Sequence, residues 1–164
     1  MAAFTKLLFA SGFDRVSVQD VAAESRHARS TFYEHFSDKE DVLRACMSPF
    51  FAVIAACVAD DRQPPELVRV LDHLFENRRL TDAIFSGVPR TILARALTDM
   101  VERHLHEMTS EALQFPSRLA AIGIAEGQLA LVENWMRGRA FARSEDVAGA
   151  LHRSSRAAAL AFLS

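Results

Sequence analysis

The sequence predicts an all-α protein, and three observations support this fold class. Half of the 164 residues are hydrophobic, and Ala, Leu, Arg and Glu dominate, which is a composition that favours helices. Only five prolines and six glycines interrupt the chain. Apolar residues recur at helical spacing, whereas no run rich in Val, Thr and Ile between turn residues indicates a strand. The length suits one compact core, or a module of about 45 residues attached to a larger one.

The amino-terminal part of the chain predicts two short helices. The segment AAFTKLLFASGF places its apolar residues at helical spacing, and Gly12 supplies a stop for the first helix. Ser17 begins the second, because Ser17-Val-Gln-Asp20 resembles a capping box, in which the hydroxyl and the carboxylate satisfy free backbone N–H groups. The second helix is expected to end near Ser25.

A third and a fourth helix follow. The third should span residues 29–35 and turn Phe32 and Phe36 inward. The motif SDKE, residues 37–40, forms a second capping box with Ser at its start, and it opens a long fourth helix that continues to about residue 60. Pro49 lies inside this helix and predicts a kink.

Loops and breaks divide the middle of the chain. The clearest loop is DDRQPP, residues 60–65, whose last proline suits the first turn of a fifth helix. A break at residues 86–89, Ser-Gly-Val-Pro, should precede a helix over about residues 90–108. The segment Phe-Pro-Ser at residues 115–117 breaks the chain again.

Two long helices are expected at the carboxyl end. The first runs from Ser117 to about Arg137 and carries two apolar stripes, so it should be buried from two directions. One stripe holds Leu119, Ile122, Leu129, Val132 and Met136, and the other holds Ile124, Leu131 and Trp135. Ser144-Glu-Asp is expected to cap and charge the start of the second helix. Two such helices at the end of a chain favour pairing with a second copy.

Charge, cysteine content and hydropathy exclude several classes of protein. The formal net charge of −2 argues against a coat of basic residues for indiscriminate nucleic-acid binding, but it allows a local basic surface. Cys46 and Cys57 have no Cys-x-x-Cys spacing, so we expect free thiols in a reducing cytoplasm. The longest apolar run, residues 50–59, is short of the about 20 residues that span a membrane, and no secretory signal is recognisable. We therefore expect a cytoplasmic protein with no membrane span.

Two segments carry a specific pattern, LLFASGFDRVSVQDVA and STFYEHFSDKEDVL. They contain a helix ending in Phe-x-x-Gly-Phe, a Ser opening the next helix, a short helix ending in Tyr-x-His-Phe, and Lys-Glu before the fourth helix. In these features residues 2–47 resemble the amino-terminal domain of the tetracycline-repressor (TetR) family of transcriptional regulators. The resemblance implies a three-helix helix-turn-helix domain at residues 1–46. A long helix would join it to a helical-bundle domain for effector binding and dimerisation at residues 47–164.

The resemblance also implies which residues meet DNA. Arg29 and Ser30 would face base edges, and an arginine at the start of a recognition helix can read guanine. The residues assigned to the phosphate backbone are Tyr33, His35 and Lys39, and those assigned to the flanking strand are Ser17 and Gln19. Such contacts to phosphates would fix the orientation of the protein on double-stranded DNA.

One part of the pattern departs from the family. Its usual turn reads Ala-Gly-Val-Ser, whereas residues 25–28 read Ser-Arg-His-Ala, which lacks both the glycine and the capping serine. Each loss costs about 1 kcal/mol, so we expect a reshaped turn or a substitute cap from Ser25 or another group. Residues 1–46 also hold six Lys and Arg against seven Asp and Glu, and Glu34 would repel phosphates if it pointed outward. The alternative function is a helical dimer that has lost DNA binding and acts through a protein partner.

Outside this module, GQLALVENWMRGRAFARSEDV resembles the eighth helix, loop and ninth helix of the family. This likeness implies a homodimer through the last two helices, bound to a palindromic operator whose half-sites lie one helical turn apart. The family further implies a ligand-responsive regulator, with a repressor as the expected kind. An unidentified small-molecule effector would bind among helices four to eight.

The candidates for effector contact are Met100, Glu126 and Trp135. Plain core packing is the alternative for the apolar residues, while Glu126 could face a ligand, the dimer partner or water. No catalytic site, metal site or cofactor is predicted. His104 and Glu107 lie near one helical face, but no carboxylate-rich second helix matches them, and the chain lacks a nucleophile elbow and a glycine-rich phosphate loop.

Overall fold

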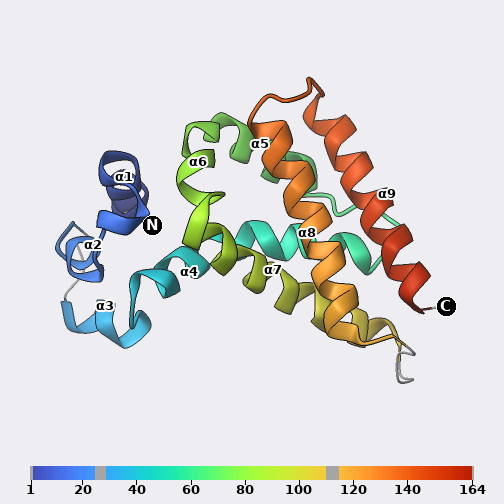
Figure 1. Ribbon diagram of the computed structural model, residues 1–164, viewed down its shortest axis with the longest axis horizontal. Coiled ribbons are helices and arrows are strands. Elements are labelled where there is room, and N and C mark those ends of the chain that lie inside the picture. Colours follow the sequence, from blue (N-terminus) through green and yellow to red (C-terminus); the bar gives the residue numbers. More distant parts are fainter. Residues whose placement is uncertain (1, 25–28, 110–114, 164) are drawn as a thin grey trace.

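The computed structural model describes residues 2–24, 29–109 and 115–163, and within these ranges it is helical with no strand (Figure 1). The prediction of an all-α fold is confirmed. The α-helices are α1 (Ala2–Ser11), α2 (Val18–Glu24), α3 (Arg29–His35), α4 (Lys39–Ala55), α5 (Leu67–Glu76), α6 (Thr81–Ile84), α7 (Gly87–Met108), α8 (Ser117–Met136) and α9 (Ser144–Leu163). Short 3-10 turns are η1 (Phe13–Arg15), η2 (Ala56–Val58) and η3 (Arg78–Leu80).

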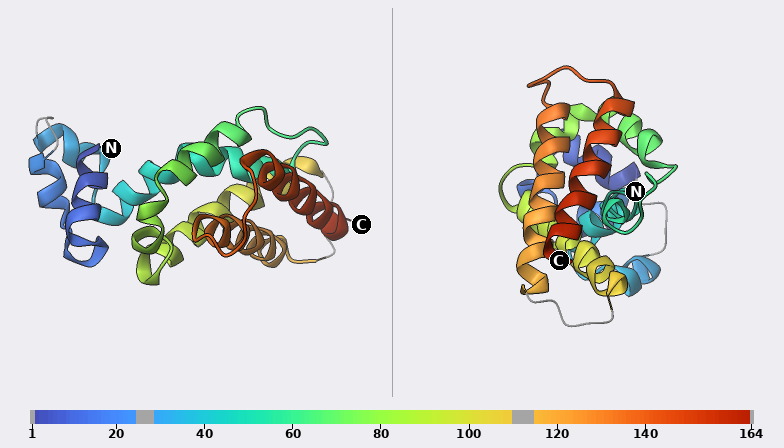
Figure 2. Two further views of the ribbon diagram at one scale, coloured as in Figure 1. Left: turned by 90° about the horizontal axis from the view of Figure 1, so that it is seen from above. Right: turned by 90° about the vertical axis from the view of Figure 1, so that its right-hand side faces the viewer.

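The molecule is elongated, with α1, α2 and α3 gathered at one end (Figure 1). Helix α4 leads from this group into a bundle formed with α5 to α9, and the carboxyl terminus lies at the far end. Helices α8 and α9 lie side by side as an outer layer of the bundle (Figure 2). Helix α7 packs against both α4 and α8, so it occupies the middle of the bundle.

The amino-terminal helices begin and end as the sequence predicts. Helix α1 stops at Gly12, whose φ of 74° lies in the left-handed region that glycine adopts without strain. The capping box of α2 is confirmed, because the Ser17 hydroxyl accepts the Asp20 N–H at 3.2 Å. In return, the Asp20 carboxylate accepts the Ser17 N–H at 3.0 Å.

The cap of α4 lies one residue later than predicted. Asp38, rather than Ser37, is the N-cap, and its carboxylate accepts the Asp41 N–H at 2.7 Å. The Ser37 N–H instead donates to the Asp41 carboxylate at 3.0 Å. Asp caps a helix as well as Ser does. The sequence therefore could not decide which of the two adjacent residues, Ser37 or Asp38, caps α4.

Two other helix starts also differ from the prediction. Helix α7 begins at Gly87 instead of near residue 90, because Pro89 is compatible with a first helical turn, where its missing N–H has no partner to lose. Ser144 is the first residue of α9 rather than its cap, and its hydroxyl donates to the Asp72 carboxylate of α5. The acidic charges expected in that first turn are present, as Glu145 and Asp146.

Apolar side chains fill the bundle. Helix α5 turns one face inward, and Leu97, in the middle of α7, is fully buried. Cys57 is buried and Cys46 partly buried, and both are free thiols, as expected. Burial raises the pKa of the Cys57 thiol to about 12, so it remains protonated and inert at neutral pH.

A polar contact ties three helices together inside this apolar core. The side-chain amide of Gln128 on α8 donates to the Ile54 carbonyl near the end of α4, and to the Ser155 hydroxyl of α9, both at 3.0 Å. Its oxygen Oε1 is buried and has no hydrogen-bond partner within the described chain.

The segment Lys39–Val58, which joins α4 to η2, is long and apolar enough to cross a membrane by length and composition. The residues of its 18-residue window are 44% buried inside the protein. The central helix of a packed bundle has the same properties, and this segment packs against α7 and α9.

Candidate nucleic-acid interface

Helices α2 and α3 are the two arms of the predicted helix-turn-helix. Phe32 fixes α3 to the core and is only 8% exposed. Its ring lies 5.1 Å from the Phe36 ring, centroid to centroid, so the two predicted inward residues pack together. The atypical turn at residues 25–28 lies outside the described residues.

The opposite face of α3 is open to solvent. Tyr33 is 44% exposed, its ring stands edge-on to Phe32, and His35 is exposed as well. Gln19 is exposed on α2. Arg29 and Ser30 belong to the first turn of α3, but their side chains lie outside the described residues. The backbone therefore gives α3 a buried and an exposed face, as recognition requires.

Ser17 is half-buried and fully occupied as a cap. Its hydroxyl donates to the Asp20 carboxylate at 2.6 Å and also accepts the Asp20 N–H. This hydrogen bond from the Ser17 hydroxyl, and a second from its backbone N–H, lower the pKa of Asp20. Because the hydroxyl hydrogen is already donated, a phosphate contact by Ser17 would compete with the cap.

Lys39 has a structural role that the sequence reading missed. Its ammonium donates to the Phe13 carbonyl at 2.9 Å and to the Asp14 carbonyl at 3.3 Å. It also lies 4.6 Å from the centroid of the Phe13 ring. Lys39 thus fastens the first turn of α4 to η1, and one of its three N–H groups remains for a phosphate.

Other carboxylates of this region also have partners. Lys6 on α1 pairs with Glu24 on α2 at 2.5 Å, and Asp41 pairs with Arg44 at 2.7 Å. The Arg44 guanidinium lowers the pKa of Asp41. Glu34, in contrast, is exposed beside Tyr33 and forms no ion pair with a described side chain. It is the negative charge most directly opposed to a phosphate at α3.

Glu126, a predicted effector contact, belongs to an ionic network between α7 and α8. The Arg90 guanidinium donates to its carboxylate at 2.6 and 3.3 Å, and to Glu133 at 3.3 Å. Arg137 also pairs with Glu133. The hydrogen bond to Glu126 is the main cause of the raised pKa of Arg90. The network therefore joins the start of α7 to the carboxyl-terminal half of α8.

The other two effector candidates lie elsewhere. Met100 is half-buried on α7. Trp135 is 6% exposed, its indole N–H donates to the Ala142 carbonyl at 2.9 Å, and its ring stacks on Phe75 at 4.7 Å. Of the three candidates, only Trp135 lines one of the larger cavities described below, so the structure does not bring them together.

Two adjoining spaces beside α4 and α5 were not anticipated. An inner cavity of about 120 Å³ and an outer groove of about 310 Å³ share Phe50 and His73. The rings of these two residues stack nearly parallel at 5.2 Å and stand where the two spaces meet. The inner cavity is also lined by Cys46, Met47, Leu74, Asn77, Leu80, Ile84 and Met136. The sequence shows an aromatic residue on α4 and a histidine on α5, but their contact depends on how the two helices pack, so the sequence alone does not predict it.

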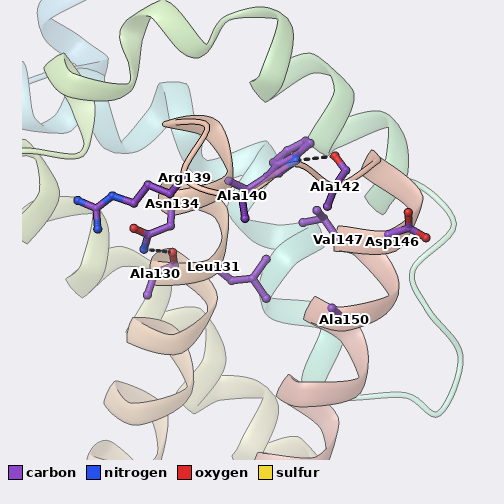
Figure 3. Close-up of a pocket in the computed structure, with 10 residues that line it drawn as sticks. Ala130, Leu131, Asn134, Arg139, Ala140, Ala142, Asp146, Val147 and Ala150 are labelled. Atoms are coloured by element: carbon purple, nitrogen blue, oxygen red, sulfur yellow. Dashed lines mark hydrogen bonds between the residues drawn. The ribbon is translucent and has the colours of Figure 1, made fainter.

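A larger and mainly apolar groove of about 460 Å³ lies on the outside of α8 and α9 (Figure 3). Its lining comes from Leu131, Asn134 and Trp135 of α8 and from Val147 of α9, among others. The labelled side chains converge from the two helices and from the loop that joins them.

In the part of the chain that the structure describes, no group of three or more His, Cys, Asp or Glu side chains could hold a metal ion. His104 Nδ1 lies 3.1 Å from the Glu107 carboxylate, in an i,i+3 pair on the surface of α7.

Residues 1–46 match the family model described as bacterial regulatory proteins, tetR family. A solved TetR-family transcriptional regulator from Syntrophomonas wolfei shares the fold, with 17% identity and a TM-score of 0.57 over 97% of this chain and 92% of that one. The dihydroxyacetone kinase operon activator DhaS is similar at 20% identity, with a TM-score of 0.51 over 99% and 95% of the two chains. No curated protein matches the sequence.

The structural likenesses, at low identity, establish the fold along nearly the whole chain. The family model concerns the amino-terminal sequence itself, where α2 and α3 form the candidate interface. The family model indicates a regulatory domain in residues 1–46. Residues 1–46 therefore carry the amino-terminal domain of the TetR family of bacterial regulatory proteins, within a chain that has the fold of solved TetR-family regulators.

Proposed function

We propose that this protein is a ligand-responsive repressor that binds an inverted-repeat operator as a homodimer in the cytoplasm. The observation that carries the DNA-binding part is the TetR-family match over residues 1–46, whose α3 buries Phe32 and exposes Tyr33 and His35. A helix anchored on one face and polar on the other can enter the major groove.

The proposed contacts divide into reading and positioning. Arg29 and Ser30 face base edges from the first turn of α3, while Tyr33 and His35 bind phosphates. Gln19 is free to touch the flanking strand, as its exposure allows. The other two assigned residues have less freedom. Ser17 must share its cap, and Lys39 has one donor left.

We assign residues 1–46 to DNA reading and residues 47–164 to dimerisation and effector binding. Helix α4 crosses this boundary, since its first turn holds η1 through Lys39 and its middle lines the cavity at Phe50. A ligand that separates the Phe50–His73 stack would join the inner cavity to the outer groove. It would also move α4, and this movement would change the distance between the DNA-binding domains of the two subunits.

The effector class follows from the lining of these two spaces. Most of it is apolar, with Cys46, His73 and Asn77 as the polar groups of the inner cavity. A mainly apolar molecule with one or two hydrogen-bonding groups fits this composition. Calorimetry with a Phe50→Ala variant tests the cavity, because a ligand that binds there should lose affinity while one at Glu126 should not.

Selection of bound sequences from a random DNA pool tests the proposed function. We expect an enriched inverted repeat with half-sites about one helical turn apart. Arg29→Ala should weaken binding to that sequence by about 1 to 3 kcal/mol and relax the preference at one base pair. Arg62→Ala is the matched control, since Arg62 is an exposed arginine in the loop before α5.

Two results would change the proposal. Absence of any enriched sequence from a folded dimer would favour the alternative, a helical dimer that acts through a protein partner. A reporter gene placed behind the selected operator decides the sign of regulation. Repression is expected, whereas DhaS carries the name of an activator.

A further inference from the structure

The outer groove beside α4 and α5 combines an apolar wall with a charged edge. Four apolar side chains line it, and they come from both helices: Pro49, Phe50, Val53 and Val70. The other lining residues are polar and stand at the start and along one side of α5: Glu66, Arg69 and His73. Their spacing of three and four residues places them on one face of the helix. The groove therefore offers a ligand both an apolar surface and charged groups.

Arg69 has no structural partner that explains its position. Its side chain is exposed, lines the groove and forms no ion pair or hydrogen bond with a described side chain. It is also the third residue of α5, in the first helical turn, where the helix dipole disfavours a positive charge. The fold thus gains nothing from a cation here, and a bound anion would supply the missing partner.

Glu66 and His73, in contrast, have structural roles. Glu66 precedes α5 as its N-cap residue, and a negative charge is favourable at that end of a helix. His73 stacks on Phe50, and its backbone carbonyl accepts the Asn77 side-chain amide at 2.8 Å. At 1.5 Å per residue, Glu66 lies about 10 Å from His73 along the helix axis, and Arg69 about 6 Å. Of the two charged groups, Arg69 is therefore the nearer to the stack, where the groove meets the inner cavity.

The inner cavity is unsuited to a charge, because none of the described residues that line it is Lys, Arg, Asp or Glu. Of its polar groups, the Asn77 amide already donates to the His73 carbonyl. The Cys46 thiol keeps its proton at neutral pH, because burial raises its pKa. A carboxylate buried there would lack a cation to pair with, which is strongly unfavourable. A ligand with an apolar chain and a charged end must therefore place the chain in the cavity and the charge in the groove.

We propose that the effector is an amphipathic monocarboxylate, such as a medium-chain fatty acid. Its chain passes between Phe50 and His73 into the inner cavity, and Arg69 binds its carboxylate in the outer groove. This inference rests on the effector site of the proposed function, and it names the class and the orientation of the ligand. Arginine suits the role because its planar guanidinium binds a carboxylate through two parallel hydrogen bonds. His73, whose ring carries an N–H in either neutral tautomer, donates a further hydrogen bond.

The Phe50–His73 stack limits the shape of the chain that can enter. The ring centroids lie 5.2 Å apart, and the rings are within 8° of parallel. A methylene group between them needs about 3.5 to 4.0 Å to each ring face, so the rings must separate by about 2 Å or more. An unbranched chain requires the smallest separation. Because Phe50 belongs to α4, entry of the chain acts directly on the helix that leads to the DNA-binding domain.

Calorimetry with the full chain tests the ligand class with four probes: octanoate, octan-1-ol, octylamine and acetate. Octanoate should bind about tenfold more tightly than octan-1-ol, which is the strength expected of one charge-assisted pair. Acetate should show no binding, because it has the charge but lacks the chain that fills the inner cavity. Octylamine should bind most weakly of the three octyl probes, since its charge has the same sign as that of Arg69.

Arg69→Gln removes the proposed carboxylate partner. It should abolish the preference for octanoate over octan-1-ol, while octan-1-ol keeps its affinity. A substitution that merely distorted the site would weaken both probes alike, so the ratio separates ligand recognition from folding. Arg103→Gln is the matched control, because Arg103 is an exposed arginine of α7 that does not line the groove. The parent and this control should show the same ratio.

Each other outcome overturns the inference in a distinguishable way. Equal binding of octanoate and octan-1-ol, with both weakened by Phe50→Ala, would retain the effector site of the proposed function and reject the carboxylate. A preference for octylamine that is lost in Glu66→Gln would mean that the groove binds a cation through Glu66. A preference for octanoate that persists in Arg69→Gln, or no binding of any probe, would also reject the inference. None of these results bears on DNA binding, which the selection of bound sequences tests separately.

Discussion

The amino-terminal head, α1 to α3, and the bundle of α5 to α9 are both helical but are stabilised in different ways. Helices α1, α2 and α3 have 10, 7 and 7 residues, whereas α7, α8 and α9 have 22, 20 and 20. Helices this short are not stable alone, so the head depends on caps and on polar contacts to the backbone in addition to its small apolar core, which includes Phe4, Phe13 and Phe32. The bundle depends mainly on buried apolar area. Substitutions in the two regions should therefore differ in size and in their dependence on pH.

The largest effect is expected in the bundle. Leu97→Ala should lower the free energy of unfolding by about 2 to 5 kcal/mol, because Leu97 is fully buried and its loss leaves a cavity. Urea denaturation followed by circular dichroism measures this loss. Val88→Ala, on the same helix but 54% exposed, should change stability by under about 0.5 kcal/mol. Equal effects would mean that α7 is not the centre of the core.

The next largest effect is expected at the contact between the head and α4. Lys39→Met keeps the alkyl stem but removes the hydrogen bonds to the Phe13 and Asp14 carbonyls, and should destabilise the head by about 1 to 2 kcal/mol. Hydrogen exchange of the α1 and α2 amides measures the head separately from the bundle. Faster exchange in the bundle than in the head would contradict this separation.

A smaller effect is expected at the cap of α2. Ser17→Ala should cost about 1 kcal/mol at neutral pH, and Ser17→Gly only a few tenths of a kcal/mol. Because the Ser17 hydrogen bonds lower the pKa of Asp20, the stability they contribute is present above the usual carboxyl pKa of about 4 and is lost as the pH falls through the lowered value. The difference between parent and Ser17→Ala should shrink below about pH 4. A difference that stays constant down to pH 2 would exclude Asp20 from the cap.

The smallest effect is expected for the ion pair between α1 and α2. Lys6→Met should change stability by about 0.5 kcal/mol or less, since the Lys6 side chain is 72% exposed and water screens the pair. It is also the control for Lys39→Met, because both remove one lysine charge from the same region. A larger loss for Lys6 than for Lys39 would reverse the roles that we assign to them.

The sequence predicted most of the fold because helix signals are local. Apolar spacing and the Ser17 capping box give the helices of the head, and the start of α3 at Arg29 agrees with the structure. Local signals failed where two residues could serve equally, as at Ser37 and Asp38, or where a proline suited a first turn, as at Pro89.

The candidate sites depended more on contacts between distant segments. The carbonyls that hold Lys39 come from residues 25 and 26 positions earlier, and no local pattern reveals them. The effector candidates were chosen by residue type, so Glu126 proved to be paired with Arg90, which lies 36 positions away. The stacked pair Phe50 and His73 was missed for the same reason, since its residues lie on separate helices.

Gln128 has a consequence for how helices of the bundle are aligned. Aliphatic side chains pack nearly as well after a helix slides by one turn, about 5.4 Å, but a hydrogen bond to one particular carbonyl does not survive that slide. The amide that joins the Ile54 carbonyl to the Ser155 hydroxyl therefore marks a single alignment of α4, α8 and α9. It does so even though its own oxygen has no hydrogen-bond partner among the described residues. Because α4 leads directly to the head, this alignment of α4 in the bundle also fixes the distance between the head and the bundle.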